Sequence, residues 1–360
     1  LIGLAVFVAH PTMGLRRKAL LTSGALAVVV MMMLAPSDVL RQISEPSDPD
    51  RRLVFYAEGA EGVITVEKGD GGLREMMLNG GGQVPTDYSS MQLFRLLGHL
   101  PLLLHPDPQD VLVVSLGGGI ALGAVAQHEL PRVTCVELVP QVVTAAREHF
   151  GPFNHDVLQA PHCPGVEIVI DDGRNYLLAN ASEYDVITGD ATHPTSADSW
   201  VLYTQEFYQL CRARLREGGI MTQWLPIHGL GVEDYQTLLR TFVHVFPHAT
   251  LWRTSNYSIL LGSTGQTRID LERLRQRVGG KLVQNSLLDV GLGDPFLVLD
   301  HFMMDEHALR RFAGEGPLNS DERPYISFAE SYGRKAWHVL ASLRQFRTPA
   351  MPLIAGPDLP

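Results

Sequence analysis

The 360-residue chain has few cysteines, modest charge and no regular metal-ligand spacing. Its three cysteines, Cys135, Cys163 and Cys211, form neither a disulfide framework nor a zinc pattern. Charged residues make up 19% of the sequence and the formal net charge is −10, which argues against nucleic acid as a partner and suits cationic ligands better. The histidines are scattered, and Ser115 lacks a His/Asp arrangement, so the sequence indicates neither a metal centre nor a serine hydrolase.

One long stretch has no charge at all: Ala19 to Ala35, directly after Arg16-Arg17-Lys18. Its length is at the short end for a membrane span. The basic residues would stay cytoplasmic, which places the rest of the chain on the periplasmic side of a bacterial inner membrane. We therefore predict an anchor in the lipid bilayer through residues 19–35, either a single span or the last span of a longer region, since the chain begins with Leu. A signal peptide starting at Met13 and a buried core helix are the alternatives.

Composition and periodicity divide the chain further. Residues 1–36 form the predicted membrane anchor and the polar residues 37–52 a linker. Short segments punctuated by glycine within 53–100 predict a small antiparallel β-domain with one helix. Residues 101–263 alternate between strand and helix patterns, which predicts a mostly parallel sheet covered on both faces. We expect residues 264–360 to form a helical extension that ends in a loose, proline-rich tail.

Within the alternating region the individual elements can be placed by their apolar runs. Strands are predicted near residues 111–115, 133–137, 166–170, 184–189, 219–223, 248–252 and 258–262, and helices near 119–129, 139–149, 173–179, 203–217 and 232–246. In such a sheet, ligands bind at the carboxyl ends of the strands.

The best-defined motif is Val111-Leu-Val-Val-Ser-Leu-Gly-Gly-Gly-Ile120, an apolar run that enters a glycine-rich turn. A second apolar run follows and carries Glu137, an order typical of a nucleotide-binding β-α-β unit. The glycines let backbone N–H groups approach a ligand, and the acid can accept two ribose hydroxyls. Asp172 and Asp190 also follow apolar runs, so we expect three carboxylates to converge on one crevice. For each acid alone, a helix N-cap is the alternative.

Further motifs occur around these acids in a characteristic order. They are Val-Glu-Leu, Asp-Asp-Gly-Arg, Tyr-Asp-Val-Ile, Leu202-Tyr-Thr-Gln-Glu-Phe-Tyr208 and Leu215-Arg-Glu-Gly-Gly-Ile-Met-Thr-Gln223. In this order they resemble the spermidine synthase (polyamine aminopropyltransferase) family, over roughly residues 53–330. A second set resembles the bacterial branch in which such a domain follows membrane spans: Leu78-Asn-Gly-Gly, Gly98-His-Leu-Pro-Leu-Leu-Leu-His-Pro106, Gln223-Trp-Leu-Pro-Ile, Val245-Phe-Pro-His248 and Leu318-Asn-Ser-Asp-Glu-Arg-Pro324.

The resemblance implies an α/β fold with a Rossmann-like, methyltransferase-type sheet behind a small antiparallel β-domain. It implies transfer of an aminopropyl group from decarboxylated S-adenosylmethionine to a small amine, and a protein that can form homo-oligomers. Asp190 then matches the catalytic acid, which takes the proton of the attacking amine. The residues assigned to the cofactor are Ser115, Gly117, Gly119, Glu137 and Asp172, and those assigned to the substrate are Gln83, His193 and Tyr203.

Three departures from the family pattern concern the groups that hold the amine. Gly118 stands where the family carries the acid for the aminopropyl ammonium, and His193 replaces a second acid. The aromatic-Gln-Glu entrance motif is replaced by apolar residues around Leu93-Phe94. Losing the loop acid also removes a reason to prefer the decarboxylated cofactor over S-adenosylmethionine itself. Two hypotheses follow: a membrane-anchored enzyme with Asp190 as base, and a catalytically degenerate domain that serves as an accessory subunit of a membrane protein complex.

Overall fold

The computed structural model describes residues 14–34, 39–159, 165–196, 199–266, 268–329 and 336–355. The chain divides into two units, residues 1–49 and 50–360.

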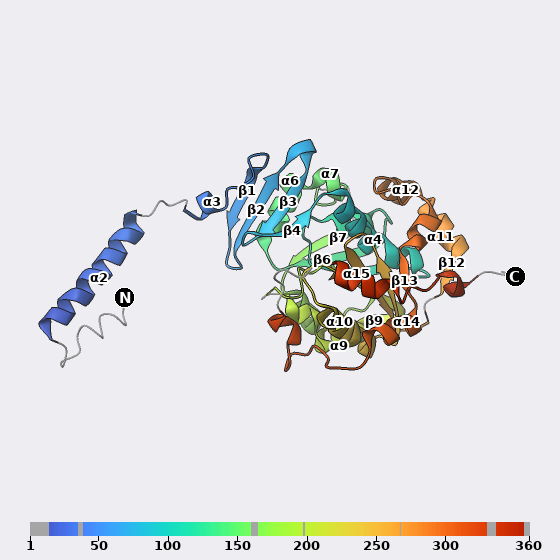
Figure 1. The fold of residues 1–360 in the computed structure, drawn as a ribbon. Helices are drawn as coiled ribbons and strands as arrows, with labels where there is room; N and C mark the ends of the chain where they lie inside the picture. Colours follow the sequence, from blue (N-terminus) through green and yellow to red (C-terminus); the bar gives the residue numbers. More distant parts are fainter. Residues whose placement is uncertain are drawn as a thin grey trace. The chain divides into compact units, whose positions relative to one another are not determined.

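The first unit contains helix α2 (Leu15–Leu34), which covers most of the predicted span, and the short helix α3 (Val39–Ile43) (Figure 1). Helix α2 includes Arg16 and Arg17 in its first turn. In the part of the chain that the structure describes, no helix combines the length and the apolar character that crossing a bilayer requires. The prediction of a membrane-spanning helix over residues 19–35 is therefore not supported.

The second unit begins with a four-stranded antiparallel sheet, as predicted. Its strands lie in sequence order: β1 (Arg52–Glu58), β2 (Val63–Lys68), β3 (Arg74–Leu78) and β4 (Gly81–Pro85). A 3₁₀ turn, η1 (Asp70–Gly72), joins β2 to β3. Ile64, Val66 and Met76 are buried on the face that packs against the main core, because alternate residues of a strand point to the same side.

The large sheet has eight strands in the order β13-β10-β11-β9-β8-β5-β6-β7. Its parallel strands are β5 (Asp110–Val114), β6 (Arg132–Glu137), β7 (Val166–Ile170), β8 (Tyr184–Gly189) and β9 (Leu215–Pro226). The antiparallel edge consists of β10 (His248–Arg253), β11 (Tyr257–Ser263) and β13 (Phe302–Met304). All seven predicted strands are present, and the strand order reverses at β5, between β6 and β8.

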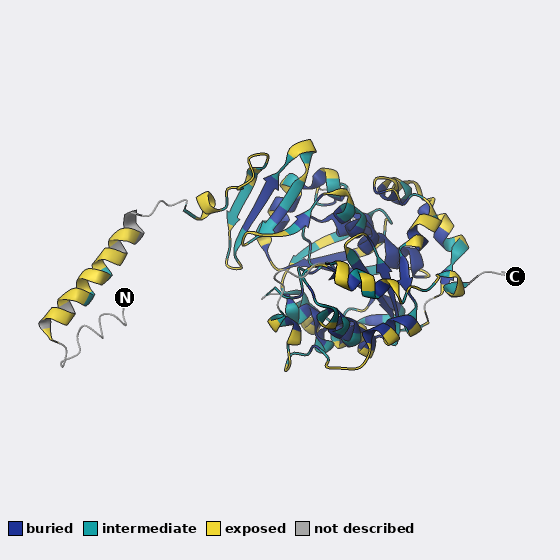
Figure 2. Cartoon of the chain, viewed as in Figure 1, coloured by how far each residue is buried: buried dark blue, intermediate teal, exposed yellow. Residues whose placement is uncertain are grey.

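Helices cover both faces of this sheet. They are α4 (Tyr88–Leu104), α5 (Ile120–Ala126), α6 (Pro140–His149), α7 (Gly151–Asn154), α8 (Gly173–Ala179), α9 (Gln205–Ala213) and α10 (Val232–Val245), with the 3₁₀ turn η2 (Trp200–Tyr203) before α9. Val111 and Val113 of β5 belong to one hydrophobic core, with α4 and α5, whereas Leu112 and Val114 belong to a second core, with α9 and α10. Figure 2 shows the buried strands of the sheet between the helices, with the exposed residues on the outer helices and loops.

Two predicted helices are shorter than expected: α5, which ends at Ala126 and not near residue 129, and α9. The helix predicted over 203–217 ends at Ala213, and the residues from Leu215 onward already form β9. Leu215 pairs with Tyr184 of β8, so tertiary strand pairing overrides the helical preference of Leu215, Arg216 and Glu217.

The C-terminal region is helical, as predicted, and adds short strands. Its elements are β12 (Ile269–Asp270), α11 (Leu271–Val278), α12 (Lys281–Leu288), α13 (Pro295–Asp300), α14 (Glu306–Ala313), η3 (Tyr325–Phe328), α15 (Trp337–Arg344), η4 (Met351–Leu353) and β14 (Ile354–Ala355).

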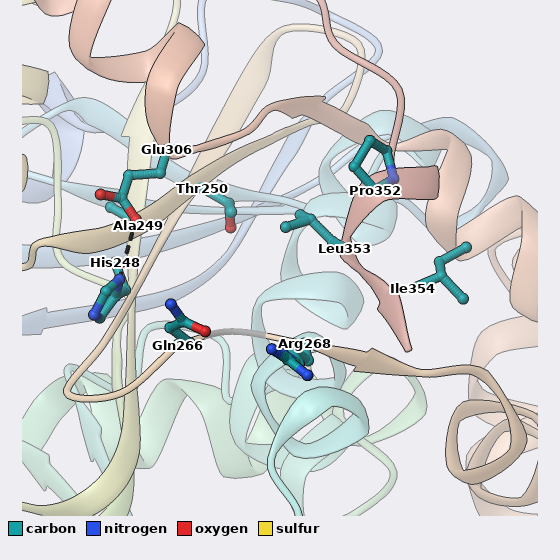
Figure 3. A pocket seen from close by; sticks show the side chains of 9 residues that line it. All are labelled: His248, Ala249, Thr250, Gln266, Arg268, Glu306, Pro352, Leu353 and Ile354. Carbon is teal, nitrogen blue, oxygen red and sulfur yellow. Dashed lines mark hydrogen bonds and ion pairs between the residues drawn. The ribbon is translucent and has the colours of Figure 1, made fainter. Parts of the chain in front are cut away.

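The prediction of a loose tail is wrong as far as Ala355. Strand β14 pairs in parallel with β12, with Ile354 opposite Ile269. Leu353 and Ile354 pack against the hydrophobic core, and with Pro352 they border a hollow of about 390 Å³ (Figure 3). This burial of apolar side chains explains why a proline-containing tail is ordered here.

Candidate active site

A cavity of about 530 Å³ lies at the carboxyl ends of the parallel strands, where the sheet order reverses. Strand register brings its polar residues together. Val114 lies opposite Val136 of β6 and opposite Gly189 of β8, so the next residues, Ser115, Glu137 and Asp190, emerge at the same edge. Residues of β3 and β4 from the small sheet line the cavity as well.

Seven of the nine site residues expected from the sequence line this cavity. They are Gln83, Ser115, Gly117, Glu137, Asp172, Asp190 and His193. Gly119 and Tyr203 are not among its lining residues.

The glycine-rich turn is held in a left-handed backbone conformation. Gly117 has a φ of 52° and Gly119 a φ of 73°, values that glycine adopts without a steric penalty. Ser115 has a φ of 73°, which is uncommon for a residue with a side chain, and its N–H donates to the Val136 carbonyl at 2.9 Å. Gly117 faces the cavity, whereas Gly119 is the N-cap of α5 and supports the turn from outside it.

Gly118 has no room for a side chain. A Cβ at this position would lie 2.8 Å from Phe150 Cδ1 and 2.9 Å from Val84 Cγ1, closer than real Cβ contacts. The carbonyl of Gly118 accepts a hydrogen bond from Asn154 Nδ2 at 3.0 Å. The side-chain direction in which an acid is expected from the family pattern is therefore filled by Phe150 and Val84.

Glu137 is buried at the end of β6 and ties the turn to the sheet. Its Oε2 accepts from the Leu116 N–H at 2.8 Å and its Oε1 from the Val139 N–H at 2.9 Å. Burial raises the pKa of Glu137, and these backbone hydrogen bonds oppose that rise. Each carboxylate oxygen keeps a second lone pair, so the side chain can still accept from the two hydroxyls of a ribose.

Asp190 follows β8, and its N–H donates to the Val114 carbonyl at 3.0 Å. Protein surrounds the carboxyl group except on the side that borders the cavity. Burial and the charge of Glu137 raise the pKa of Asp190 to about 7. A carboxylate with a pKa near neutrality is suited to take a proton during a reaction.

Asp172 has two roles. Its Oδ1 accepts from the Asn175 N–H at 2.8 Å, which makes it the N-cap of α8, and it also lines the cavity. The N-cap alternative considered for single acids is therefore real for Asp172, and it leaves part of the carboxylate for a ligand.

Tyr203 is completely buried. Its hydroxyl donates to the Thr192 carbonyl at 3.1 Å and lies 3.4 Å from the Trp224 carbonyl. A direct contact of Tyr203 with substrate is therefore not supported. The residue instead connects the segment after Asp190 to strand β9.

Several lining residues were not expected from the sequence. Among them are Glu75, Trp224, His228 and Tyr257, which come from β3, from β9, from the loop after β9 and from β11. No local motif marks Glu75, His228 or Tyr257, and it is the pairing of β9 with β11 that brings Trp224 and Tyr257 together. Only the motif that contains Trp224 offered a sequence signal.

The lining of the cavity is acidic. Its carboxylates are Glu61, Glu75, Glu137, Asp172 and Asp190, and neither Lys nor Arg is found among the described lining residues. Glu75 is paired with Arg51, which lies outside the lining. Such a cavity favours a ligand that carries positive charge.

Together the reversed strand order, the antiparallel edge, the glycine turn and the acid after β6 define a Rossmann-like protein of the methyltransferase type. Residues 92–255 match the model of the spermine/spermidine synthase domain family. Polyamine aminopropyltransferase 2 of Pseudomonas aeruginosa is 29% identical over 268 residues, which cover 71% of this chain and 74% of the relative. Polyamine aminopropyltransferase 1 of the same organism is 30% identical over 214 residues, which cover 57% of this chain and 73% of the relative.

The fold of a solved spermidine synthase in complex with the transition state analogue AdoDATO is also similar. Its TM-score is 0.53 at 22% identity, over 63% of this chain and 77% of that one, a likeness of fold. The chain belongs to the spermidine synthase (polyamine aminopropyltransferase) family, which confirms the resemblance found in its motifs. Membership of the membrane-associated branch stays a prediction.

Proposed function

We propose that this protein is an aminopropyltransferase, which transfers an aminopropyl group from an adenosyl sulfonium compound to a small amine. The observation that carries the proposal is the convergence of Glu137, Asp172 and Asp190 on one cavity beside the glycine turn. Its family membership supports the same reaction.

The residues at the β5–β6 end of the cavity fit an adenosine group. Glu137 is placed to accept from ribose hydroxyls, and Asp172 can accept from the exocyclic amine of adenine. The left-handed turn at Ser115 and Gly117 lets a ligand approach the backbone closely. The cofactor supplies a propyl carbon bonded to a positively charged sulfur.

The charge of the cavity favours decarboxylated S-adenosylmethionine over S-adenosylmethionine. Two carboxylates that repel each other, Glu137 and Asp190, are stabilised in their charged forms by a neighbouring cation. The carboxylate of intact S-adenosylmethionine would enter a cavity in which the described residues supply acids and no Lys or Arg. We therefore expect the decarboxylated compound to bind more tightly, although Gly118 lacks the family's acid.

Asp190 acts as the base. A free alkylamine has a pKa of about 10 and is mostly protonated near neutrality, so its lone pair must be released before it can attack. Asp190, with a pKa of about 7, can hold the ammonium and accept its proton.

Calorimetric titration of the full chain with decarboxylated S-adenosylmethionine, S-adenosylmethionine and methylthioadenosine tests the proposal, together with an assay for methylthioadenosine release in the presence of amines. We expect Glu137→Gln to weaken nucleoside binding about tenfold, because a ribose hydroxyl loses a charged acceptor. Glu233→Gln, on the exposed first turn of α10, is the matched control and should bind normally. If none of the three compounds binds the unchanged protein, the proposal is wrong.

The alternative, a degenerate domain that serves a membrane protein complex, is not supported, since the three acids and the glycine turn share one cavity. An inner-membrane location, with the globular unit on the periplasmic side, remains a prediction from the sequence.

A further inference from the structure

Most acids that line the cavity already have a task in the proposed reaction. Glu137 and Asp172 fit the adenosine group, and Asp190 is the base. Among the lining residues that the structure describes, two acids remain, Glu61 and Glu75. Glu61 is exposed, whereas the side chain of Glu75 is only 23% exposed. A carboxylate that is partly shielded from water attracts a cation more strongly than an exposed one, which favours Glu75.

The small sheet leaves space for Glu75 at the cavity. Glu75 lies on β3, and Gly82 lies on the neighbouring strand β4 and lines the cavity as well. A Cβ on Gly82 would collide with Glu75 Oε1, so the glycine leaves free the space that this oxygen occupies. The other oxygen, Oε2, forms the ion pair with Arg51. Oε1 can therefore accept a hydrogen bond from a ligand while Oε2 keeps its partner.

Arg51 does not neutralise this part of the small sheet. Glu67 of β2 lies directly opposite Glu75 in the strand register, so two carboxylates lie side by side. Arg51 pairs with both of them, with Glu67 at 3.1 Å, and its own side chain is 40% exposed. The next pair in the register, Lys68 and Arg74, points to the other face of the sheet. Two carboxylates that share one guanidinium therefore keep one unit of negative charge.

Glu75 acts on the side of the cavity that β9 and β11 form. Burial and the charges of Asp87 and Glu75 raise the pKa of Tyr257, a lining residue of β11. Asp87 is used as the N-cap of α4: its Oδ1 accepts from the Ser89 and Ser90 N–H groups. Its Oδ2 accepts from the Ser90 hydroxyl at 2.6 Å, and Asp87 is not among the described lining residues. Glu75 is therefore the acid that a ligand can reach on this side.

His193, which neighbours Trp224 of β9, supplies no charge to the same side. Its Nε2 lies 3.2 Å from the His228 carbonyl oxygen, which can only accept, so Nε2 donates to it. Its Nδ1 then accepts from the Thr195 hydroxyl at 2.8 Å. Burial lowers the pKa of His193, so the ring is neutral near neutral pH. A second ammonium of the acceptor must find its countercharge elsewhere in the lining, because a cation that loses its hydration needs one.

We propose that Glu75 is a specificity-determining residue, which holds the far ammonium of an acceptor that carries two amino groups. The inference rests on the proposed function, in which Asp190 serves the reacting amine. The far ammonium donates to Glu75 Oε1 beside Gly82. Together with Arg51 it then supplies two positive charges to the carboxylates of Glu67 and Glu75. The small sheet thus provides the charge that His193 does not.

Matched amine pairs measure the coupling between Glu75 and a second ammonium in the full chain. Pentylamine and 1,4-diaminobutane have the same number of heavy atoms, as do hexylamine and 1,5-diaminopentane, and each pair differs in a terminal methyl against a terminal ammonium. Calorimetric titration at saturating methylthioadenosine gives the ratio of the monoamine dissociation constant to that of the diamine. We expect Glu75→Gln to lower this ratio about fivefold, because only the diamine loses a countercharge. A ratio that Glu75→Gln leaves unchanged overturns the inference.

Two further variants separate the recognition of charge from a loss of structure. Glu58→Gln, which changes an exposed acid of the same sheet outside the described lining, is the control and should leave the ratio unchanged. Arg51→Gln removes the competing cation and should raise the ratio about threefold, opposite to the effect of Glu75→Gln. If Arg51→Gln instead lowers the ratio as Glu75→Gln does, the ion pair acts only through the structure of the small sheet, which contradicts the inference.

Methylthioadenosine binding distinguishes a failure of this inference from a failure of the proposed function. Absence of methylthioadenosine binding by the unchanged protein contradicts the proposed function. Normal nucleoside binding, together with an amine ratio that does not depend on Glu75, contradicts this inference alone.

Discussion

At the scale of single residues, the decisive feature is a pair of carboxylates that follow β6 and β8, the two neighbours of β5. Glu137 is buried and Asp190 is half-buried at the cavity. Glu137 has both oxygens engaged by backbone N–H groups, so its charge is held in place. Among the residues that the structure describes, no backbone N–H donates to the carboxyl group of Asp190, and burial together with Glu137 raises its pKa to about 7. These different environments suit the two chemically similar groups to the tasks proposed above, ligand binding by Glu137 and proton transfer by Asp190.

Asp190→Asn should lower kcat by about 100-fold or more, because proton transfer to a placed side chain contributes about that much. Methylthioadenosine binding should persist, since Glu137 is untouched. In the unchanged protein kcat/KM should rise with pH and level off above about pH 7, as Asp190 loses its proton. Steady-state assays over a pH series check both results. Activity of the variant close to that of the unchanged protein would exclude Asp190 as the base.

The same substitution, Asp190→Asn, should lower activity but increase the stability of the folded protein at higher pH. The pKa of Asp190 rises from 3.8 in the unfolded chain to about 7 in the folded one, so the folded state holds the proton more strongly. The unchanged protein therefore loses stability as the pH rises from about 4 to about 7, and Asp190→Asn does not. We expect the variant's advantage in unfolding free energy to be about 2 kcal/mol larger at pH 8 than at pH 5. Urea denaturation at both pH values measures it.

Gly118→Asp restores the acid of the family pattern, but this acid should not be able to hold the aminopropyl ammonium. The new Cβ would meet Phe150 and Val84 below 3 Å, and both are buried. We expect a loss of about 2 kcal/mol in unfolding free energy and weaker nucleoside binding, because the turn must shift. Gly69→Asp is the control, since the nearest atom to its Cβ is 4.0 Å away. A Gly118→Asp protein as stable as this control would show that the turn can accommodate the acid.

The acids of the site could be predicted from sequence, and the approach of Trp224 to Tyr257 could not. Glu137, Asp172 and Asp190 each end an apolar run, and parallel strands expose their carboxyl ends on one edge. Trp224 and Tyr257 come together through antiparallel pairing of β9 with β11, which no local pattern specifies. Tyr203 lies in a family motif, but only the structure shows that its hydroxyl is hydrogen-bonded to backbone carbonyls.

At the scale of secondary-structure elements, the chain end stabilises the edge of the large unit. Strand β14 adds to β12, next to the hollow bordered by His248, Gln266 and Arg268 (Figure 3). His248 is hydrogen-bonded to Glu306 of α14 at 3.1 Å, so strand β10 and helix α14 are linked beside the tail. Proline content suggested a loose tail because it limits regular structure, but two apolar residues are sufficient to dock this short segment.

Ile354→Asp should therefore destabilise the protein, by about 2 kcal/mol, because it places a charge where an apolar side chain packs on the core. Met351→Asp is the matched control: Met351 lies in the same segment and is 57% exposed. Thermal unfolding should show a lower Tm for the first variant and an unchanged Tm for the second. Equal Tm values for the two would mean that β14 does not contribute to stability.

The starts and ends of the helices show which boundaries the local sequence pattern predicts and which it does not. Helices that follow parallel strands were placed well, because turn signals such as Asp172-Gly173 mark their starts. The end of α9 was not, since Leu215-Arg216-Glu217 favours a helix by itself and becomes strand only through β8.

At the scale of the whole molecule, two hydrophobic cores on opposite faces of one sheet hold the cavity in place. The first core joins the small sheet to α4 and β5, so the residues from β3 and β4 that line the cavity are fixed relative to the glycine turn. The alternating strand and helix pattern predicted a covered parallel sheet, but not the addition of β13 to its edge, because a three-residue strand has no pattern of its own.

These two cores, and all described residues that line the cavity, belong to the unit that begins at Asp50. A protein that consists of residues 50–360 should therefore fold by itself, with a Tm within about 2 °C of the full chain. Its affinity for methylthioadenosine should stay within about twofold, because Glu137, Asp172 and the glycine turn are retained. Calorimetric scans measure the Tm of both proteins, and calorimetric titrations measure their affinity for methylthioadenosine. Weaker binding by the Glu137→Gln variant of the shorter protein would show that methylthioadenosine binds at the same site. A large drop in Tm on removal of residues 1–49 would mean that the first unit contributes to the folded state of the second.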